Sequence, residues 1–140
     1  MQTESNSESA TAEMAAALAR EITAPALIFL HGPLGAGKSV FARQLIRTLA
    51  GDPHLDVPSP TFTLVQTYDT PAASLWHFDL YRLKDPEEIY ELGWEEVLDG
   101  NIVLVEWPER LGALAPANAL HVTITPVHGA PEKRMIEIKQ

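Results

Sequence analysis

Eight consecutive residues in the first third of the chain, GPLGAGKS (32–39), have the types and spacing of a polyphosphate-binding loop. Gly32, Gly37, Lys38 and Ser39 fit the pattern of glycine, four residues, glycine, lysine and a hydroxyl residue. Glycines let the backbone approach phosphates, the lysine reaches the β and γ oxygens, and the serine hydroxyl can coordinate Mg²⁺. The alternative is a glycine-rich turn that carries an ordinary surface lysine. The motif therefore predicts binding of a polyphosphate together with Mg²⁺.

Two acidic residues are candidates for the carboxylate that such a site needs at the end of a neighbouring strand. Asp79 closes LWHFD, and Glu106 closes the more apolar IVLVE. Either could hold the metal or orient a water molecule. Glu106 is the better candidate, because four consecutive branched aliphatic residues suit a central strand buried on both faces. For both residues the alternative is a strand-end carboxylate that faces solvent.

The segment SPTF (59–62) follows the helix that the phosphate-binding loop predicts. In P-loop switches, a segment at this place carries a hydroxyl or backbone group towards the γ-phosphate. Thr61 is the candidate for that group, and Ser59 is the weaker one. The alternative is a rigid connector, since prolines pre-set the backbone.

Other chemistry finds no support in the sequence. The five histidines have no metal-ligand spacing, and no nucleophile-elbow motif is present, so zinc and acyl-transfer chemistry are unsupported. Trp76, Trp94 and Trp107 are assigned to the core or to an interface, with no catalytic role.

Hydrophobic patterning predicts the elements that must position these residues. Residues 1–8 are polar and predict a flexible tail, and the alanine-rich stretch 9–22 predicts a helix capped by Ser9 or Thr11. The remaining expectations are a buried parallel strand at 25–31, a helix at 38–50, a hairpin from 62–70 and 74–81, a helix at 85–93 capped by Asp85, a buried strand at 101–107, and a closing hairpin from 119–126 and 133–139. Together they predict an α/β fold. We expect a single P-loop NTPase domain over residues 9–140, with a mixed β-sheet of parallel core strands and antiparallel hairpins, flanked by helices.

Composition limits the partners and the compartment. Ten basic against nineteen acidic residues give the 140-residue chain a net charge of −9, which disfavours direct binding to nucleic acid. No apolar run approaches the roughly 18 residues of a membrane span, and no signal peptide is recognisable. The absence of cysteine excludes disulfides and thiolate metal sites. We expect no membrane association and a cytoplasmic location.

Four motifs in this order resemble the TsaE family, also known as YjeE. They are GPLGAGKS, SPTFTLV, HFDLYRL followed by DPEE, and LVEWPE, and the resemblance runs from about Ser9 to Arg134. It implies an ATPase that acts with TsaD and TsaB in making N6-threonylcarbamoyladenosine at position 37 of tRNA, with tRNA contacted only through these partners. ATP and Mg²⁺ are the implied cofactors.

The resemblance also implies residue roles. Leu34, Gly35, Ala36, Gly37, Lys38 and Ser39 would wrap the phosphates, and Ser39 and Glu106 would hold Mg²⁺. Asp79 would belong to a nucleotide-responsive switch region. The segment from Glu8 to Thr11 and the basic residue Arg134 would lie at the nucleotide.

Two other functions remain open. A P-loop small-molecule kinase would share the phosphate cradle, but between Pro53 and Pro116 the only basic side chains for a lid, apart from His54 and His77, are Arg82, Lys84 and Arg110. An ATP-sensing interaction module would use binding rather than hydrolysis. A GTPase is less favoured, because no guanine-recognition signature occurs. The chain also shows no arginine finger, so we expect an ATPase of this kind to be slow without its partners.

Overall fold

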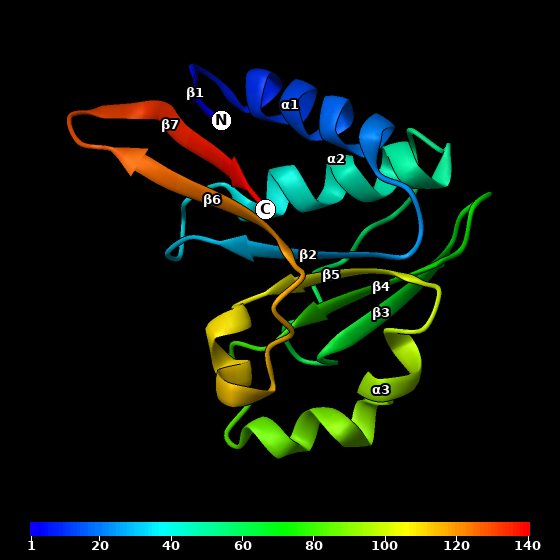
Figure 1. The fold of residues 1–140 in the computed structure, drawn as a ribbon. Coiled ribbons are helices and arrows are strands. Elements are labelled where there is room, and N and C mark those ends of the chain that lie inside the picture. Colours follow the sequence, from blue (N-terminus) through cyan, green and yellow to red (C-terminus); the bar gives the residue numbers. More distant parts are fainter.

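One mixed sheet of seven strands organises the chain, and helices cover both of its faces (Figure 1). The computed structural model describes residues 1–140. Its elements are β1 (Gln2–Ser5), α1 (Glu8–Glu21), β2 (Ala26–His31), α2 (Lys38–Ala50), β3 (Val65–Asp69), β4 (Ser74–Asp79), the 3-10 helix η1 (Pro86–Leu92), α3 (Trp94–Val97), β5 (Ile102–Glu106), the 3-10 helix η2 (Pro108–Leu114), β6 (Leu120–Val127) and β7 (Ala130–Lys139). The strand order is β1-β7-β6-β2-β5-β4-β3.

The centre of the sheet is parallel and its margins are antiparallel. β2 pairs in parallel with β5 on one side and with β6 on the other, and β4 pairs in parallel with β5. β3 with β4, β6 with β7, and β1 with β7 form antiparallel pairs. The predicted α/β fold with parallel core strands and antiparallel hairpins is therefore confirmed. Because parallel strands end at the same edge, the carboxyl ends of β2, β4 and β5 lie together.

Two hydrophobic cores lie on opposite faces of the sheet. Alternate residues of β2 supply one core each: Ile28 and Leu30 face α1 and α2, whereas Leu27 and Phe29 face η1, α3 and η2. β5 divides its residues in the same way, and all five of them are buried. This two-sided burial explains the uninterrupted aliphatic run of β5. In Figure 1, α1 and α2 lie above the sheet and the short helices lie below it.

The amino-terminal end differs from its prediction. Residues 1–8 were expected to be a flexible tail, but Gln2–Ser5 forms β1 and pairs with β7, and the side chain of Ser5 is buried. The helix begins at Glu8, and its cap is Ser7, whose hydroxyl accepts a hydrogen bond from the amide of Ala10 at 3.0 Å. The expected caps, Ser9 and Thr11, lie inside the helix.

The other predicted elements are present, with one change of type. Asp85 caps its helix with a complete capping box, but residues 86–92 form a 3-10 helix rather than an α-helix. Gly93, in the left-handed region, ends that turn and is followed by α3. No helix of the chain is long and apolar enough to span a membrane.

Candidate functional site

The glycine-rich loop joins the end of β2 to the start of α2 at the carboxyl edge of the sheet. A Cβ atom at Gly32 would lie 2.6 Å from the carbonyl oxygen of Ile124 in β6, so no larger residue fits there without a backbone shift. Gly37 caps α2 in the left-handed region with φ 99°, which favours glycine. This geometry places the first amides of a 13-residue helix beside the loop, where an anion would be stabilised.

Arg134 of β7 holds the loop from behind. Its Nε donates to the carbonyl of Ala36 at 2.8 Å, and its Nη2 donates to that of Gly35 at 3.4 Å. Ala36 is fully buried, whereas Leu34 projects outwards with 69% of its surface exposed. The predicted loop residues therefore form one structural unit, and Arg134 contacts this unit through the loop's own carbonyl groups.

Lys38 is buried in the loop and lacks any hydrogen-bond partner. Its side chain is almost inaccessible, its Nζ makes no hydrogen bond or salt bridge, and this atom lies 3.6 Å from the centre of the Trp107 ring. Burial lowers the pKa of Lys38 from its ordinary value, and the nearby carboxylates, Glu106 first among them, act in the opposite direction. A buried ammonium without a partner is costly, so this atom fits an anion that the protein itself does not supply.

Asp79 and Glu106 lie side by side at the ends of β4 and β5. They are register partners in the parallel pair, and both are buried. Asp79 accepts hydrogen bonds from the hydroxyl of Thr61 at 3.1 Å and from the amide of Tyr81 at 3.0 Å. The hydroxyls of Ser59 and Thr61 are 2.7 Å apart. The structure thus brings together the Thr61 segment, predicted to be a switch, and Asp79, predicted to be a strand-end acid.

Glu106 has a buried partner that the sequence analysis overlooked. His77 Nε2 lies 2.7 Å from Glu106 Oε2, and His77 is 2% exposed. The search for metal-ligand spacing missed this histidine because its partner is 29 residues away. One signal was available: His77 interrupts the apolar middle of β4, in which Leu75 and Phe78 are both fully buried.

The oxygen donors at this edge suit Mg²⁺. Ser39 is exposed in the first turn of α2, and carboxylate and hydroxyl oxygens are hard ligands of the kind that Mg²⁺ binds. No cluster of three or more histidine, cysteine or acidic side chains could hold a metal alone. A Mg²⁺ ion would therefore need ligands from phosphate and water as well, which is how it is usually bound in nucleotide sites. Ser39 and Glu106 fit this pattern.

A series of aromatic rings connects Lys38 with the surface. The Trp107 ring, which contacts Lys38, lies 4.9 Å from that of Tyr81, and the Arg110 guanidinium lies 5.9 Å from the Tyr81 ring. Trp107 adopts a left-handed conformation (φ 57°) immediately after Glu106. The sequence analysis gave this tryptophan no role beyond packing, because its placement depends on an irregular backbone that no local pattern encodes.

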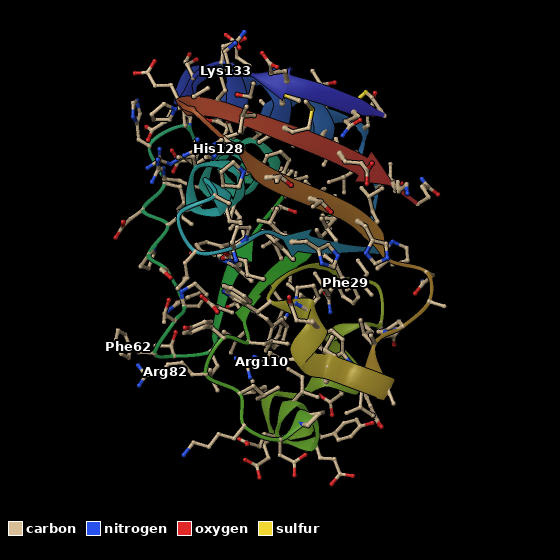
Figure 2. The ribbon with its side chains drawn as sticks, turned by 90° about the vertical axis from the view of Figure 1, so that its left-hand side faces the viewer. Phe29, Phe62, Arg82, Arg110, His128 and Lys133 are labelled. Carbon is tan, nitrogen blue, oxygen red and sulfur yellow. The ribbon has the colours of Figure 1, made fainter.

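Beside this series, Phe62 projects into solvent with 82% of its surface exposed, and the Arg82 guanidinium lies 4.7 Å from its ring. Figure 2 shows these two side chains together at the margin of the molecule, with Arg110 further in. Phe62 directly follows Thr61. A change in the Thr61 segment would therefore move an exposed aromatic side chain.

A hollow of about 290 Å³ lies behind the loop, between the start of α1 and β7. Its wall consists of Ser7, Glu8, Thr11, Gly37, Val40, Pro131, Glu132 and Arg134. Thr11 is buried, and its hydroxyl is 2.7 Å from that of Ser5. The structure therefore brings Thr11 and Arg134 to one hollow next to the phosphate-binding loop.

Comparisons with known proteins agree on one family. The family model for "Threonylcarbamoyl adenosine biosynthesis protein TsaE" matches residues 5–136. The TsaE protein of Rickettsia bellii is 46% identical over 123 residues, which are 88% of this chain and 85% of that protein. The TsaE protein of Rickettsia typhi is 40% identical and covers 96% of this chain, with 92% of its own length aligned.

A more distant relative and a solved structure extend this result. The Haemophilus influenzae TsaE protein is 36% identical over 99 residues, which are 70% of this chain and 61% of that protein. A solved structure, "Crystal structure of Bacillus subtilus YdiB", superposes with a TM-score of 0.76 over 99% of this chain and 83% of its own, at 22% identity, and supports the fold. The chain belongs to the TsaE family of tRNA threonylcarbamoyladenosine biosynthesis proteins.

Proposed function

We propose that the chain is a Mg²⁺-dependent ATPase required for the N6-threonylcarbamoyladenosine modification of tRNA at position 37. It would act in the cytoplasm with TsaD and TsaB and hydrolyse ATP to drive or reset the threonylcarbamoyl-transfer cycle. Family membership supports the pathway. The single observation that carries the hydrolytic part is the buried Lys38 ammonium, which has no protein partner and lies in a glycine loop beside two strand-end carboxylates.

The chain's own residues would divide the work of phosphoryl transfer. The loop amides and Lys38 would bind the phosphates and offset their negative charge, and Ser39 and Glu106 would hold Mg²⁺. Mg²⁺, when bound, supplies positive charge that neutralises the phosphate oxygens. Asp79 would hold the Thr61 hydroxyl, as it does in the structure, so that this segment can respond to the γ-phosphate.

The charge distribution supports a dependence on partners. The chain carries a net charge of −9, so tRNA would be bound by TsaD and TsaB rather than by this protein. Two arginines lie against aromatic rings: Arg82 over Phe62 and Arg110 near Tyr81. Neither arginine is assigned to the phosphates in this proposal, so turnover by the chain alone should be slow.

The proposal is tested by measuring ATP turnover and tRNA modification together, with and without TsaB and TsaD. Phosphate release should rise when the partners are added. Lys38→Ala and Glu106→Ala should each lower it by about 100-fold or more, because each removes charge that acts in the transition state. Lys84→Ala, which alters an exposed lysine, serves as the matched control and should keep wild-type turnover. Unchanged turnover in both site variants would contradict the proposal.

A nucleotide-sensing module is the second candidate, and the aromatic series from Lys38 to Arg110 favours it. In that case ATP binding alone would change the surface that partners contact. If the Glu106→Ala protein binds ATP and supports full tRNA modification, the result supports the nucleotide-sensing module over the ATPase. A small-molecule kinase would instead be revealed by mass spectrometry, as phosphate transferred to an added nucleoside or sugar.

A further inference from the structure

We propose that His77 is a positioning residue that holds the Glu106 carboxylate in the orientation in which it binds Mg²⁺. The inference rests on the proposed function, because it assigns Glu106 to the metal. Its basis is the hydrogen bond of 2.7 Å between His77 Nε2 and Glu106 Oε2, at a place where both side chains are buried. An ionised carboxylate can only accept hydrogen bonds, so Nε2 is the donor.

Strand register brings the two side chains together. His77 is paired with Leu104 on β5, and Glu106 lies two residues further along that strand. Residues two apart on a strand lie on the same face, and a diagonal neighbour on the adjacent strand is within reach of a long side chain. This face also carries Leu75 and Leu104, which pack below α1 and α2. On the face of β4 that packs against α1 and α2, His77 thus directly precedes Asp79 and lies next to the proposed metal ligands.

Packing alone does not explain a histidine here. The position continues the row of Leu75, and an apolar side chain would fill it without any desolvation of a polar group. Instead, His77 Nδ1 is buried with no hydrogen-bond partner, and the other ring nitrogen bonds only to Glu106. An unsatisfied buried polar atom destabilises the fold. A histidine at this position therefore lowers the stability of the fold, and its hydrogen bond to Glu106 offers a functional reason for its presence.

The bond also determines which cation Glu106 can bind. Among the neighbouring carboxylates, Glu106 has the largest effect in raising the pKa of Lys38, yet the two side chains form no salt bridge. His77 occupies Oε2 and leaves Oε1 for a metal ion. Without His77, the buried carboxylate would be free to turn towards the Lys38 ammonium. An ion pair between Glu106 and Lys38 would draw Glu106 away from Mg²⁺ and Lys38 away from the phosphates.

The test compares two polar replacements that differ in reach. In His77→Gln the amide nitrogen ends at the level of Nε2 and can still donate to Glu106, whereas in His77→Asn it ends one bond short. Affinity for fluorescent mant-ADP is measured in EDTA and then as a function of Mg²⁺. His121→Asn, which alters a histidine on the opposite face of the sheet, is the matched control.

His77→Asn should raise the Mg²⁺ concentration for half-maximal enhancement of binding by about 10- to 100-fold, the usual effect of removing a group that orients a metal ligand. Its affinity for mant-ADP in EDTA should stay at the wild-type level, since the phosphate cradle is intact. His77→Gln and His121→Asn should both follow the wild-type metal dependence. Thermal unfolding of each variant, recorded without metal, checks that the proteins are folded.

Two results would overturn the inference. One is an equal Mg²⁺ dependence in His77→Asn and His77→Gln, and the other is a wild-type dependence in His77→Asn. If the nucleotide affinity of the wild-type protein does not depend on Mg²⁺, the result contradicts the metal site itself and the proposed function with it. That outcome is distinct from a failure of the inference about His77.

Discussion

At the scale of single residues, the site is defined by side chains whose neighbours lie far away in the sequence. The loop motif itself is local, and its spacing alone predicted the cradle. Contacts such as Arg134 to Ala36, 98 residues apart, fix the shape of that cradle. Local pattern contains no information about them. This is why the loop could be predicted from the sequence, whereas the contact of His77 with Glu106 and the position of Trp107 could not.

Gly32 offers a test of the cradle at this scale. Gly32→Ala places a methyl group 2.6 Å from the Ile124 carbonyl oxygen, so the backbone of the loop or of β6 must shift. Gly100→Ala is the matched control, because Gly100 has φ 77° but nothing within 4 Å of the added atom. Gly100→Ala should cost about 1–2 kcal/mol of left-handed strain.

The free energy of unfolding of both variants is measured by urea denaturation. Gly32→Ala should lose more stability than Gly100→Ala and should also lose binding of mant-ADP, which Gly100→Ala should keep. Equal losses of stability, with nucleotide binding intact in both proteins, would show that the close approach to Ile124 does not matter.

At the scale of elements, hydrophobic pattern predicted the central strands well, because burial on both faces leaves a continuous aliphatic run. It predicted α2 because the buried residues of that helix recur at helical spacing. It failed at β1, whose sequence QTES contains no apolar residue. That strand is formed by pairing with β7, and Ser5 is buried through its hydrogen bonds to Ser7 and Thr11. A polar strand of four residues that depends on a distant partner gives no local signal.

The start of α1 yields a prediction that separates the observed cap from the expected one. Ser7→Ala removes the hydroxyl that accepts from the Ala10 amide and should lower the free energy of unfolding by about 1 kcal/mol. Ser9→Ala alters an exposed residue inside the helix and should be neutral or slightly stabilising, since alanine is the better helix former. Chemical denaturation of the two proteins checks this. A larger loss from Ser9→Ala would contradict the assigned cap.

At the scale of the whole molecule, charge acts differently on the two phosphate-bearing ligands of the proposed function, ATP and tRNA. Local amides and Lys38 can attract a compact polyphosphate despite a net charge of −9, because they act at short range. An extended phosphate backbone would instead contact the acidic surface. The fold is confirmed by its superposition on a solved structure, and it presents the glycine-rich loop to the proposed nucleotide. The net charge of −9 disfavours RNA binding.

Binding of the chain to unmodified tRNA is therefore expected to be undetectable by gel mobility shift, even at low salt. Addition of TsaB and TsaD should make retention of tRNA possible, which provides the positive control. A shift by this protein alone, with affinity falling steeply as salt is added, would contradict the expectation, because that dependence signals direct phosphate contacts.

The arrangement of the strands also has a consequence for biosynthesis. β2 leaves the ribosome early, yet its two neighbours in the sheet are β5 and β6, which are translated much later. A nascent chain consequently exposes the aliphatic residues of β2 to chaperones until Ile102–Glu106 has emerged. The cradle is completed later still, because Gly32 packs on Ile124 and the loop carbonyls bond to Arg134. The predicted phosphate-binding loop thus reaches its final shape only after nearly the whole polypeptide has been translated.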